Sequence, residues 1–354
     1  MRIYLFMFFL TLTLMSCVEA PIPPKNNIGE LSEHGAYILC EGLYGQNNSS
    51  LNRYDFTNKT VHSNFFQQIN GKYIGDTAND IVIKGDTAFI VVSTQKEVIM
   101  FNTKTGKLIS EILIVEGKYP RKLAVLNDSI ILVSDLYAHC LWVINYKTSV
   151  IMKNVSTGPA PEGIAICENY IFVANSGFGD YLADEPKAGT ISVFDSRTLN
   201  GIKSFSHLPN VIELKISTKH QKLYARYNHL PKYTDSLGGI VEFDISNLLE
   251  TRRWKDRTGQ FAFSENEDTL YYNCDDGVKF IDLKSFQAIP ELLIHKSMKT
   301  DYWYSLAYYK NNLWIGNAKD YQSHGEILIF DVNNPQNLKE KFNVGLNPNT
   351  IVFF

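Results

Sequence analysis

Four acidic side chains near predicted strands could carry out acid–base chemistry. Asp80, Glu162 and Glu213 lie in or beside short apolar segments, and Asp301 lies just ahead of another. Two carboxylates in different environments can act as general acid and general base, as in glycoside hydrolysis. No GxSxG, HExxH, P-loop or GxGxxG pattern accompanies them. We therefore expect a protein that is not an enzyme, and keep a hydrolase or lyase using these acids as an alternative.

Three histidines could ligate a metal ion or the cobalt of a corrinoid. They are His139, His229 and His324, and all three fall in predicted loops. Their spacing matches no metal-binding motif, and a surface histidine with an ordinary hydrogen bond is the more common case. We expect neither a metal site nor a cofactor.

Aromatic and amide side chains gather in the predicted loops. Aromatic faces supply contact area and amides fix orientation, so such a mixture suits a large, flat, mostly neutral ligand with hydrogen-bonding edges. For any single tyrosine, packing against a neighbouring loop is the alternative. The candidate ligand-binding residues are Tyr44, Gln46, Asn47, Asn48, Tyr73, Tyr119, Arg121, Tyr137, His139, Phe178, Tyr181, His229, Tyr233, Tyr302, Trp303, Tyr321 and His324.

The elements that must position these residues form a repeat. Seven times, an apolar pair or triplet is followed by Asp or Asn, two variable residues, and usually Thr, Ser or Asn. The copies are spaced by 38 to 50 residues, which indicates one repeated supersecondary unit. Asp and Asn suit a turn because their side chains bond backbone N–H groups two residues on. The turn positions are Asp55, Asn102, Asn145, Asp195, Asp244, Asp282 and Asp331.

Each unit contains four predicted strands. In residues 158–205 the strands are 164–167, 170–174, 190–194 and 202–205, the first two nearly all apolar and the last more polar. Four strands per unit, repeated around an axis, predict an all-β fold, a seven-bladed β-propeller with four-stranded blades. The first blade lacks a first strand before Tyr37, and the C-terminal residues 349–354 supply it and close the ring. A pair of β-sandwiches would not require seven copies of one turn.

Loop lengths predict which face of the ring is functional. The loops joining second to third strands and fourth to first strands are long, as in 175–189 and 227–239. The opposite turns, such as Glu168-Asn169, have two or three residues. Binding residues concentrate on loops held by a rigid scaffold, so the long-loop face is the expected binding face.

The third and fourth units resemble a known repeat. The residues Pro161-x-Gly163-Ile-Ala, followed by Phe172-Val-Ala-Asn and Ile191-Ser-Val-Phe-Asp195, resemble the YVTN-type repeat of YncE-like seven-bladed propellers. The opening segment 38–55, with Glu41-Gly42 and Asn47-Asn-Ser-Ser, resembles surface lipoproteins of Bacteroidota with this fold, notably the cobalamin-binding BtuG type.

That resemblance implies a function. Such proteins lie beside TonB-dependent outer-membrane transporters and capture a nutrient for them. The resemblance implies a corrinoid (vitamin B12) as the ligand and a TonB-dependent receptor as the partner. A ferric siderophore is the alternative ligand, and a protein-interaction scaffold without a small-molecule ligand is the alternative role.

The N-terminus predicts export and a lipid anchor. Residues 1–17 have signal-peptide proportions, with Arg2, an apolar run too short to span a bilayer, and Leu-Met-Ser-Cys17. This ending resembles a bacterial lipobox, in which Cys17 becomes acylated. Residues 18–34 predict a flexible tether and 35–354 the propeller. We expect an outer-membrane lipoprotein, membrane-bound through its anchor and exposed at the cell surface.

Composition excludes one class of partner. The formal net charge of the 354 residues is −3, so the basic footprint of a nucleic-acid binder is missing and we expect no nucleic-acid partner.

The cysteines at 40, 140, 167 and 274 form no CxxC or Cys/His cluster and are expected to be buried thiols.

Overall fold

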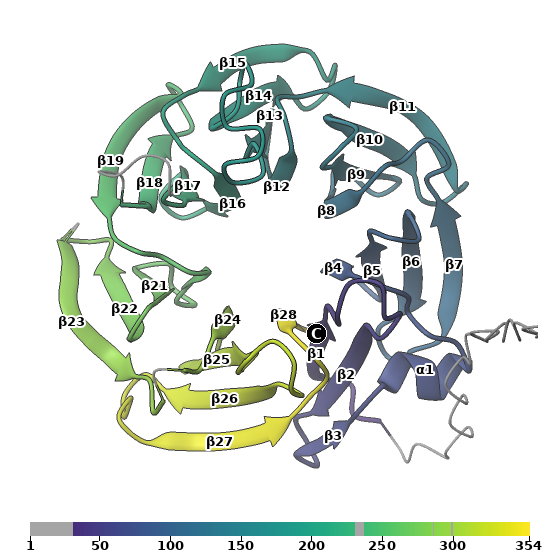
Figure 1. Cartoon of the computed structure of the whole chain (residues 1–354), viewed down its shortest axis with the longest axis vertical. Coiled ribbons are helices and arrows are strands. Elements are labelled where there is room, and N and C mark those ends of the chain that lie inside the picture. The colour runs from purple at the N-terminus through teal and green to yellow at the C-terminus, as the bar shows by residue number, and fades with distance from the viewer. Residues whose placement is uncertain (1–30, 231–236, 286, 299) are drawn as a thin grey trace, which may run out of the picture.

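The computed structural model describes residues 31–230, 237–285, 287–298 and 300–354. These residues form seven antiparallel four-stranded sheets arranged in a ring (Figure 1), which confirms the predicted seven-bladed β-propeller. No helix among them is long and apolar enough to cross a membrane. Cys17, most of the predicted tether and Tyr233 lie outside the described residues.

The blades follow one another in the chain, each contributing its first strand to the centre of the ring (Figure 1). Blade 1 contains β28 (Pro348–Phe353), β1 (Gly35–Cys40), β2 (Ser50–Asp55) and β3 (Thr60–His62); blade 2 contains β4 (Ala78–Lys84), β5 (Thr87–Val92), β6 (Glu97–Asn102) and β7 (Leu108–Leu113); blade 3 contains β8 (Pro120–Val125), β9 (Ile130–Asp135), β10 (Cys140–Asn145) and β11 (Val150–Ser156). Blade 4 contains β12 (Pro161–Cys167), β13 (Tyr170–Asn175), β14 (Thr190–Asp195) and β15 (Gly201–Phe205); blade 5 contains β16 (Val211–Ser217), β17 (Lys222–Tyr227), β18 (Gly239–Asp244) and β19 (Leu249–Lys255). Blade 6 contains β20 (Phe261–Phe263), β21 (Thr269–Cys274), β22 (Gly277–Asp282) and β23 (Gln287–His295); blade 7 contains β24 (Trp303–Tyr309), β25 (Asn312–Asn317), β26 (Glu326–Asp331) and β27 (Leu338–Asn343).

The repeated Asp or Asn forms the turn between the third and fourth strand of every blade. In all seven, its side-chain Oδ1 accepts a hydrogen bond from the backbone N–H two residues on, at 2.8–3.1 Å. In blade 4, Asp195 also accepts from the backbone N–H of Thr198 at 2.7 Å, and these bonds lower the pKa of Asp195. These turns are therefore scaffold, since the bonds satisfy backbone donors locally.

The ring closes as the sequence predicts. Strand β28 pairs antiparallel with β1, with Ile351 opposite Ile38. The last ring, Phe354, stacks on Tyr37 at 4.6 Å and lies 4.8 Å from the guanidinium carbon of Arg53. Arg53 is fully buried and donates to the carbonyl oxygens of Thr103 and Lys104 at 3.3 and 3.1 Å. Arg53 of blade 1 thus contacts both the C-terminal residue, Phe354, and the backbone of blade 2.

The apolar core lies between neighbouring blades. Buried side chains of β13 and β14 pack against those of β16, β17 and β18, and equivalent clusters separate other blades. One helix, α1 (Phe65–Asn70), follows the three-residue strand β3 and buries Phe65 and Phe66 against blades 1 and 2. The repeat pattern does not predict α1. The described chain begins at Leu31, within the predicted tether, and Leu31 packs against this same cluster.

Candidate functional site

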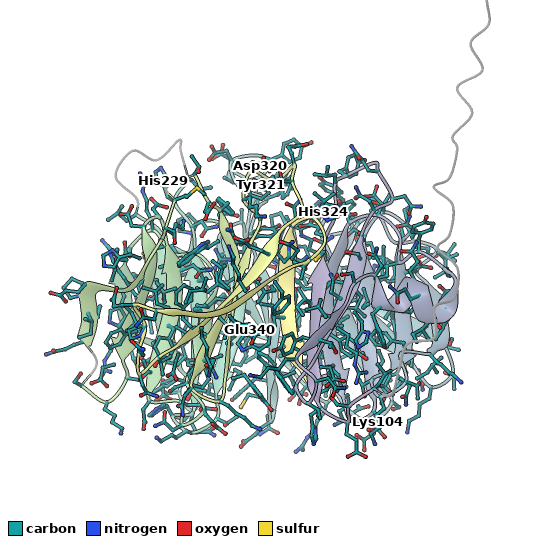
Figure 2. All side chains as sticks on the ribbon, turned by 90° about the horizontal axis from the view of Figure 1, so that it is seen from below. Lys104, His229, Asp320, Tyr321, His324 and Glu340 are labelled. Carbon is teal, nitrogen blue, oxygen red and sulfur yellow. The ribbon has the colours of Figure 1, made fainter. Side chains whose placement is uncertain are left out.

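Long loops mark one face of the ring, which we call the loop face. It carries the connections between second and third strands, including 41–49, 176–189, 318–325 and the described ends of 228–238. The opposite turns between first and second strands are short, such as residues 85–86 and 168–169. Figure 2 places His229, Asp320, Tyr321 and His324 at one face and Lys104 at the other. The predicted asymmetry between the faces is therefore present.

A cavity of about 510 Å³ occupies the centre of the ring. Its wall contains residues of β28, β4, β8, β12, β16 and β24, together with Gln260 just before β20, so every blade contributes. The wall carries apolar side chains such as Val82, Leu306 and Val352 alongside many polar and charged ones. We call this space the central cavity.

Arg121 connects side chains from several blades across one side of the central cavity. Its Nε donates to Glu162 Oε2 at 3.0 Å, its Nη1 lies 3.7 Å from Glu41 Oε1, and Nη1 also donates to Asn79 Oδ1. Tyr304 donates its hydroxyl to the other oxygen of Glu41 at 2.6 Å. Burial alone would lower the pKa of Arg121, but the two carboxylates raise it above its ordinary value. The guanidinium is a permanent charge that holds both acids in place.

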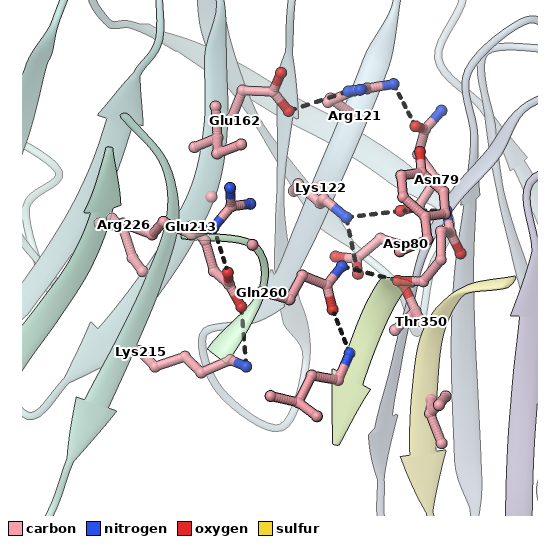
Figure 3. A pocket seen from close by; sticks show the side chains of 18 of the residues that line it. Asn79, Asp80, Arg121, Lys122, Glu162, Glu213, Lys215, Arg226, Gln260 and Thr350 are labelled. Carbon is pink, nitrogen blue, oxygen red and sulfur yellow. Dashed lines mark hydrogen bonds and ion pairs between the residues drawn. The ribbon is translucent and has the colours of Figure 1, made fainter. Parts of the chain in front are cut away.

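A second group of ion pairs lies on blades 2, 3 and 5 (Figure 3). Lys122 Nζ lies 3.6 Å from Asp80 Oδ1. Lys215 Nζ and Arg226 Nε each lie 2.9 Å from one oxygen of Glu213. Burial raises the pKa of Asp80, whereas at Glu213 the two cations outweigh burial and lower the pKa.

The charges on the described cavity wall therefore balance. Glu41, Asp80, Glu162 and Glu213 face Arg121, Lys122, Lys215 and Arg226, four acids against four bases. Three of the four acids considered for acid–base chemistry lie at the axis as expected, each beside a cation; Asp301 is not among the residues lining the cavity. This arrangement suits a fixed polar surface.

A row of aromatic rings lies on the loop face at blades 3 and 4. Tyr119 and Tyr137 have ring centroids 5.5 Å apart, Tyr137 and Phe178 6.0 Å, and Phe178 and Tyr181 6.4 Å. Tyr137 is 38% exposed, Phe178 42% and Tyr181 74%. We call these four residues the aromatic row. Four successive rings with exposed area form a contact surface that no described segment covers.

A second aromatic group lies on blade 7. Tyr302 and Tyr321 have centroids 4.6 Å apart, and Tyr304 lies 5.7 Å from Tyr321. Tyr302 is 48% exposed and, with Tyr304, lines the central cavity. Burial, followed by the hydrogen bond with Tyr302, raises the pKa of Tyr321. We call these three residues the tyrosine cluster; it joins the loop face to the polar cavity wall.

The comparisons with known proteins support this architecture. The family model described as "Domain of unknown function (DUF5074)" matches residues 34–209. That match covers just under half of the chain, and no curated protein matches the sequence.

Two solved structures illustrate the fold. A quinonprotein alcohol dehydrogenase-like protein from Bacteroides thetaiotaomicron VPI-5482 is 15% identical, with a TM-score of 0.70, covering 90% of this chain and 78% of that one. The hydrazine synthase of Kuenenia stuttgartiensis is 14% identical, with a TM-score of 0.65, covering 78% of this chain and 95% of that one. At such identities the likeness concerns the fold alone, and the finer resemblance to YncE-like and BtuG-type proteins stays a prediction.

The structure brings about half of the candidate residues together. Tyr119, Tyr137, Phe178 and Tyr181 form the aromatic row, and Tyr302 and Tyr321 belong to the tyrosine cluster. Arg121 and Trp303 line the central cavity, and His229 lines a smaller pocket beside it.

The other candidates lie apart or have local roles. Tyr44 is 76% exposed, and Asn48 accepts from the backbone N–H of Leu43 at 2.8 Å, which shapes the 41–49 loop that also carries Gln46 and Asn47. His139 Nδ1 accepts from the Ala160 N–H at 3.1 Å, and Nδ1 of His324 lies 3.2 Å from the Val344 carbonyl. Tyr73 is half-buried and in neither aromatic group. Among the described residues no three His, Cys, Asp or Glu side chains gather as metal ligands would.

Sequence reasoning missed most of the polar cavity wall. Glu41, Asn79, Lys122, Lys215, Arg226, Tyr304 and Asn349 line the central cavity without having been candidates. Polar residues inside otherwise apolar first strands, such as Lys215 between Leu214 and Ile216, were the signal that could have identified several of them.

Proposed function

We propose that this chain is a non-enzymatic binding protein of the cell envelope that captures a nutrient on its loop face. The observation that carries the proposal is the presence of two aromatic groups on the loop face, one of which reaches the charge-balanced central cavity through Tyr302. The aromatic row comes from blades 3 and 4, the tyrosine cluster comes from blade 7, and Tyr302 belongs to both the loop face and the cavity wall.

Both parts favour a large ligand with few formal charges. Stacking rings supply apolar contact area that is tolerant of ligand detail. The wall offers fixed hydrogen-bonding groups whose charges are already neutralised, so a neutral amide-edged molecule would meet little desolvation cost there. A corrinoid has this shape and this chemistry, and the sequence resemblance points to the same ligand. The proposed route continues to a TonB-dependent outer-membrane receptor, with the chain held by a lipid on Cys17 at the cell surface.

The absence of catalysis is part of the proposal. A pair of carboxylates acting as acid and base needs one group that can release a proton at the working pH. Here Glu162 lies 3.0 Å from Arg121, and Glu213 lies 2.9 Å from both Lys215 and Arg226. At Glu213 the two cations outweigh burial and lower the pKa, so this acid stays ionised at neutral pH, which counts against it as a general acid.

The test is a calorimetric titration of the purified full chain with cyanocobalamin and, separately, with ferric siderophores. We expect cyanocobalamin to bind with a Kd in the micromolar range or tighter. Binding of a ferric siderophore alone would replace the corrinoid with the alternative ligand. Binding of neither, together with stable co-purification of an envelope protein, would show an interaction scaffold and overturn capture of a small molecule.

A further inference from the structure

A second pocket opens beside the central cavity, between blades 5, 6 and 7, and we call it the side pocket. It has a volume of about 310 Å³ and shares Arg226, Asn228, Gly259, Tyr302 and Trp303 with the central cavity. None of its described lining residues is Ala, Val, Leu, Ile, Met or Phe. The described wall thus has no aliphatic side chain of these types, and its charged and polar groups offer hydrogen-bonding partners to a ligand.

Cations outnumber acids on the wall of the side pocket. Its described lining residues include three cations, Arg226, Arg257 and Lys296, and one carboxylate, Asp275. Arg226 is held in place by Glu213, outside this pocket, through the 2.9 Å contact. Even after counting Glu213, the fixed charges leave an excess of one positive charge. The side pocket thus differs from the central cavity, where acids and bases balance.

The two outer cations can exchange their present partner for a ligand. Arg257 Nη1 lies 3.4 Å from Asp275 Oδ2, and both side chains are about two-thirds exposed, 66% and 67%. Lys296 Nζ donates to the backbone carbonyl of Asp275 at 2.8 Å. Exposed ion pairs contribute little free energy, so replacing this one by an oxyanion costs little. A guanidinium also binds carboxylate or phosphate through two parallel hydrogen bonds, which the single 3.4 Å contact does not use.

Two buried polar atoms on the same wall have no hydrogen-bond partner. They are Nε1 of Trp303, a donor, and Oδ1 of Asn273, an acceptor. Trp303 is 5% exposed and Asn273 2%. Lys296 Nζ also lies 5.7 Å from the centre of the Trp303 ring. Both atoms are shielded from solvent and so lie behind the pocket wall, which leaves Arg257 and Lys296 as the groups that can contact an anion.

We propose that the side pocket binds an anionic group, a carboxylate or a phosphate, between Arg257 and Lys296. This deepens the proposed function, because the anionic group would belong to the ligand captured on the loop face through the shared Tyr302 and Trp303. It adds a requirement that the aromatic groups do not impose: a ligand bearing a carboxylate or phosphodiester binds more tightly than its neutral analogue.

The test measures anion binding by itself. Inorganic phosphate and citrate are titrated calorimetrically into the full chain at low salt, and into Arg257→Gln and Lys296→Gln. Both changes lie at exposed or half-buried positions, so the fold is retained. We expect at least one anion to bind, with about a tenfold loss of affinity in each variant, as for the loss of one charge-assisted hydrogen bond. Lys284→Gln is the control, because its 68% exposed side chain pairs with Asp268, which is not among the side pocket's lining residues.

The outcomes separate this inference from the proposed function. Two results would overturn the side pocket as an anion site. One is no binding of either anion at ten-millimolar concentration, on the order expected for a weak isolated group. The other is equal affinities in wild type and both variants. Equal loss in Lys284→Gln would show a general charge effect and also overturn it. Anion binding without cyanocobalamin binding would support the anion site and reject only the corrinoid.

Discussion

Arg121→Met tests whether one guanidinium holds the polar wall of the central cavity together. The substitution keeps a long apolar stem but leaves Glu162, whose side chain is 8% exposed, and Glu41, 16% exposed, without their cation. Breaking a buried pair by removing one partner costs about 3–5 kcal/mol. Arg121 itself is 23% exposed, so water screens part of the interaction and we expect the low end, a loss of about 3 kcal/mol in the free energy of unfolding.

The assay is equilibrium urea unfolding at pH 7, followed by tryptophan fluorescence. The matched control is Lys84→Met, because Lys84 and its partner Asp128 are 52% and 86% exposed. Such an exposed pair contributes at most about 1 kcal/mol. The double variant Arg121→Met with Glu162→Gln should recover part of the loss, since one unpaired acid is removed. A loss below about 1 kcal/mol for Arg121→Met, no greater than for the control, would show that Arg121 does not hold the polar wall of the central cavity together.

Three further predictions concern binding, pH and ring closure. Phe178→Ala should weaken ligand binding about thirtyfold in calorimetry, because a ligand covering its 42% exposed ring removes roughly 80 Å² from water, about 2 kcal/mol; unchanged affinity would place the ligand elsewhere. The pKa of Glu213 is lowered, so its contribution to stability is present above about pH 4.5 and is lost as the pH falls through the folded-state pKa. Lys215→Met should therefore destabilise the protein more at pH 7 than at pH 3 in urea unfolding, and equal losses at both pH values would contradict that sign. Phe354→Ala should lower the free energy of unfolding by about 2 kcal/mol, because the ring stacks on Tyr37 at 4.6 Å; a neutral effect would show that the closing strand holds through its backbone alone.

The fold could be predicted because its signals are local and repeated. Asp195 and its six equivalents each form the same turn with residues two positions on, so a short sequence pattern carries the whole geometry. The closing strand followed from counting, since blade 1 lacked one strand and the chain ends in the apolar run Ile-Val-Phe-Phe, residues 351–354. Helix α1 could not be predicted in this way, because six residues are too few to show a helical period.

The site was predictable only in part, because its contacts join distant residues. Loop lengths identified the loop face, and aromatic content identified the aromatic row. The contact between Tyr304 and Glu41 spans 263 positions in the chain and depends on blades 7 and 1 meeting at closure. No local pattern in the sequence encodes such a pair. All four cysteines outside the leader were expected to be buried thiols. Cys40, Cys140 and Cys167 are free and buried, whereas Cys274 is free but only partly buried. Burial raises the pKa of Cys40 and of Cys140 to about 12.

Hydrogen–deuterium exchange of the full chain, with and without saturating cyanocobalamin, tests most directly whether the loop face captures the ligand. Capture on the loop face predicts slower exchange in the loops 136–139, 176–189 and 318–325, which carry most of the aromatic row and Tyr321. It predicts unchanged exchange in the opposite turns around Lys104 and residues 126–129. Protection confined to those opposite turns or to the outer strands, or no protection anywhere, would contradict it.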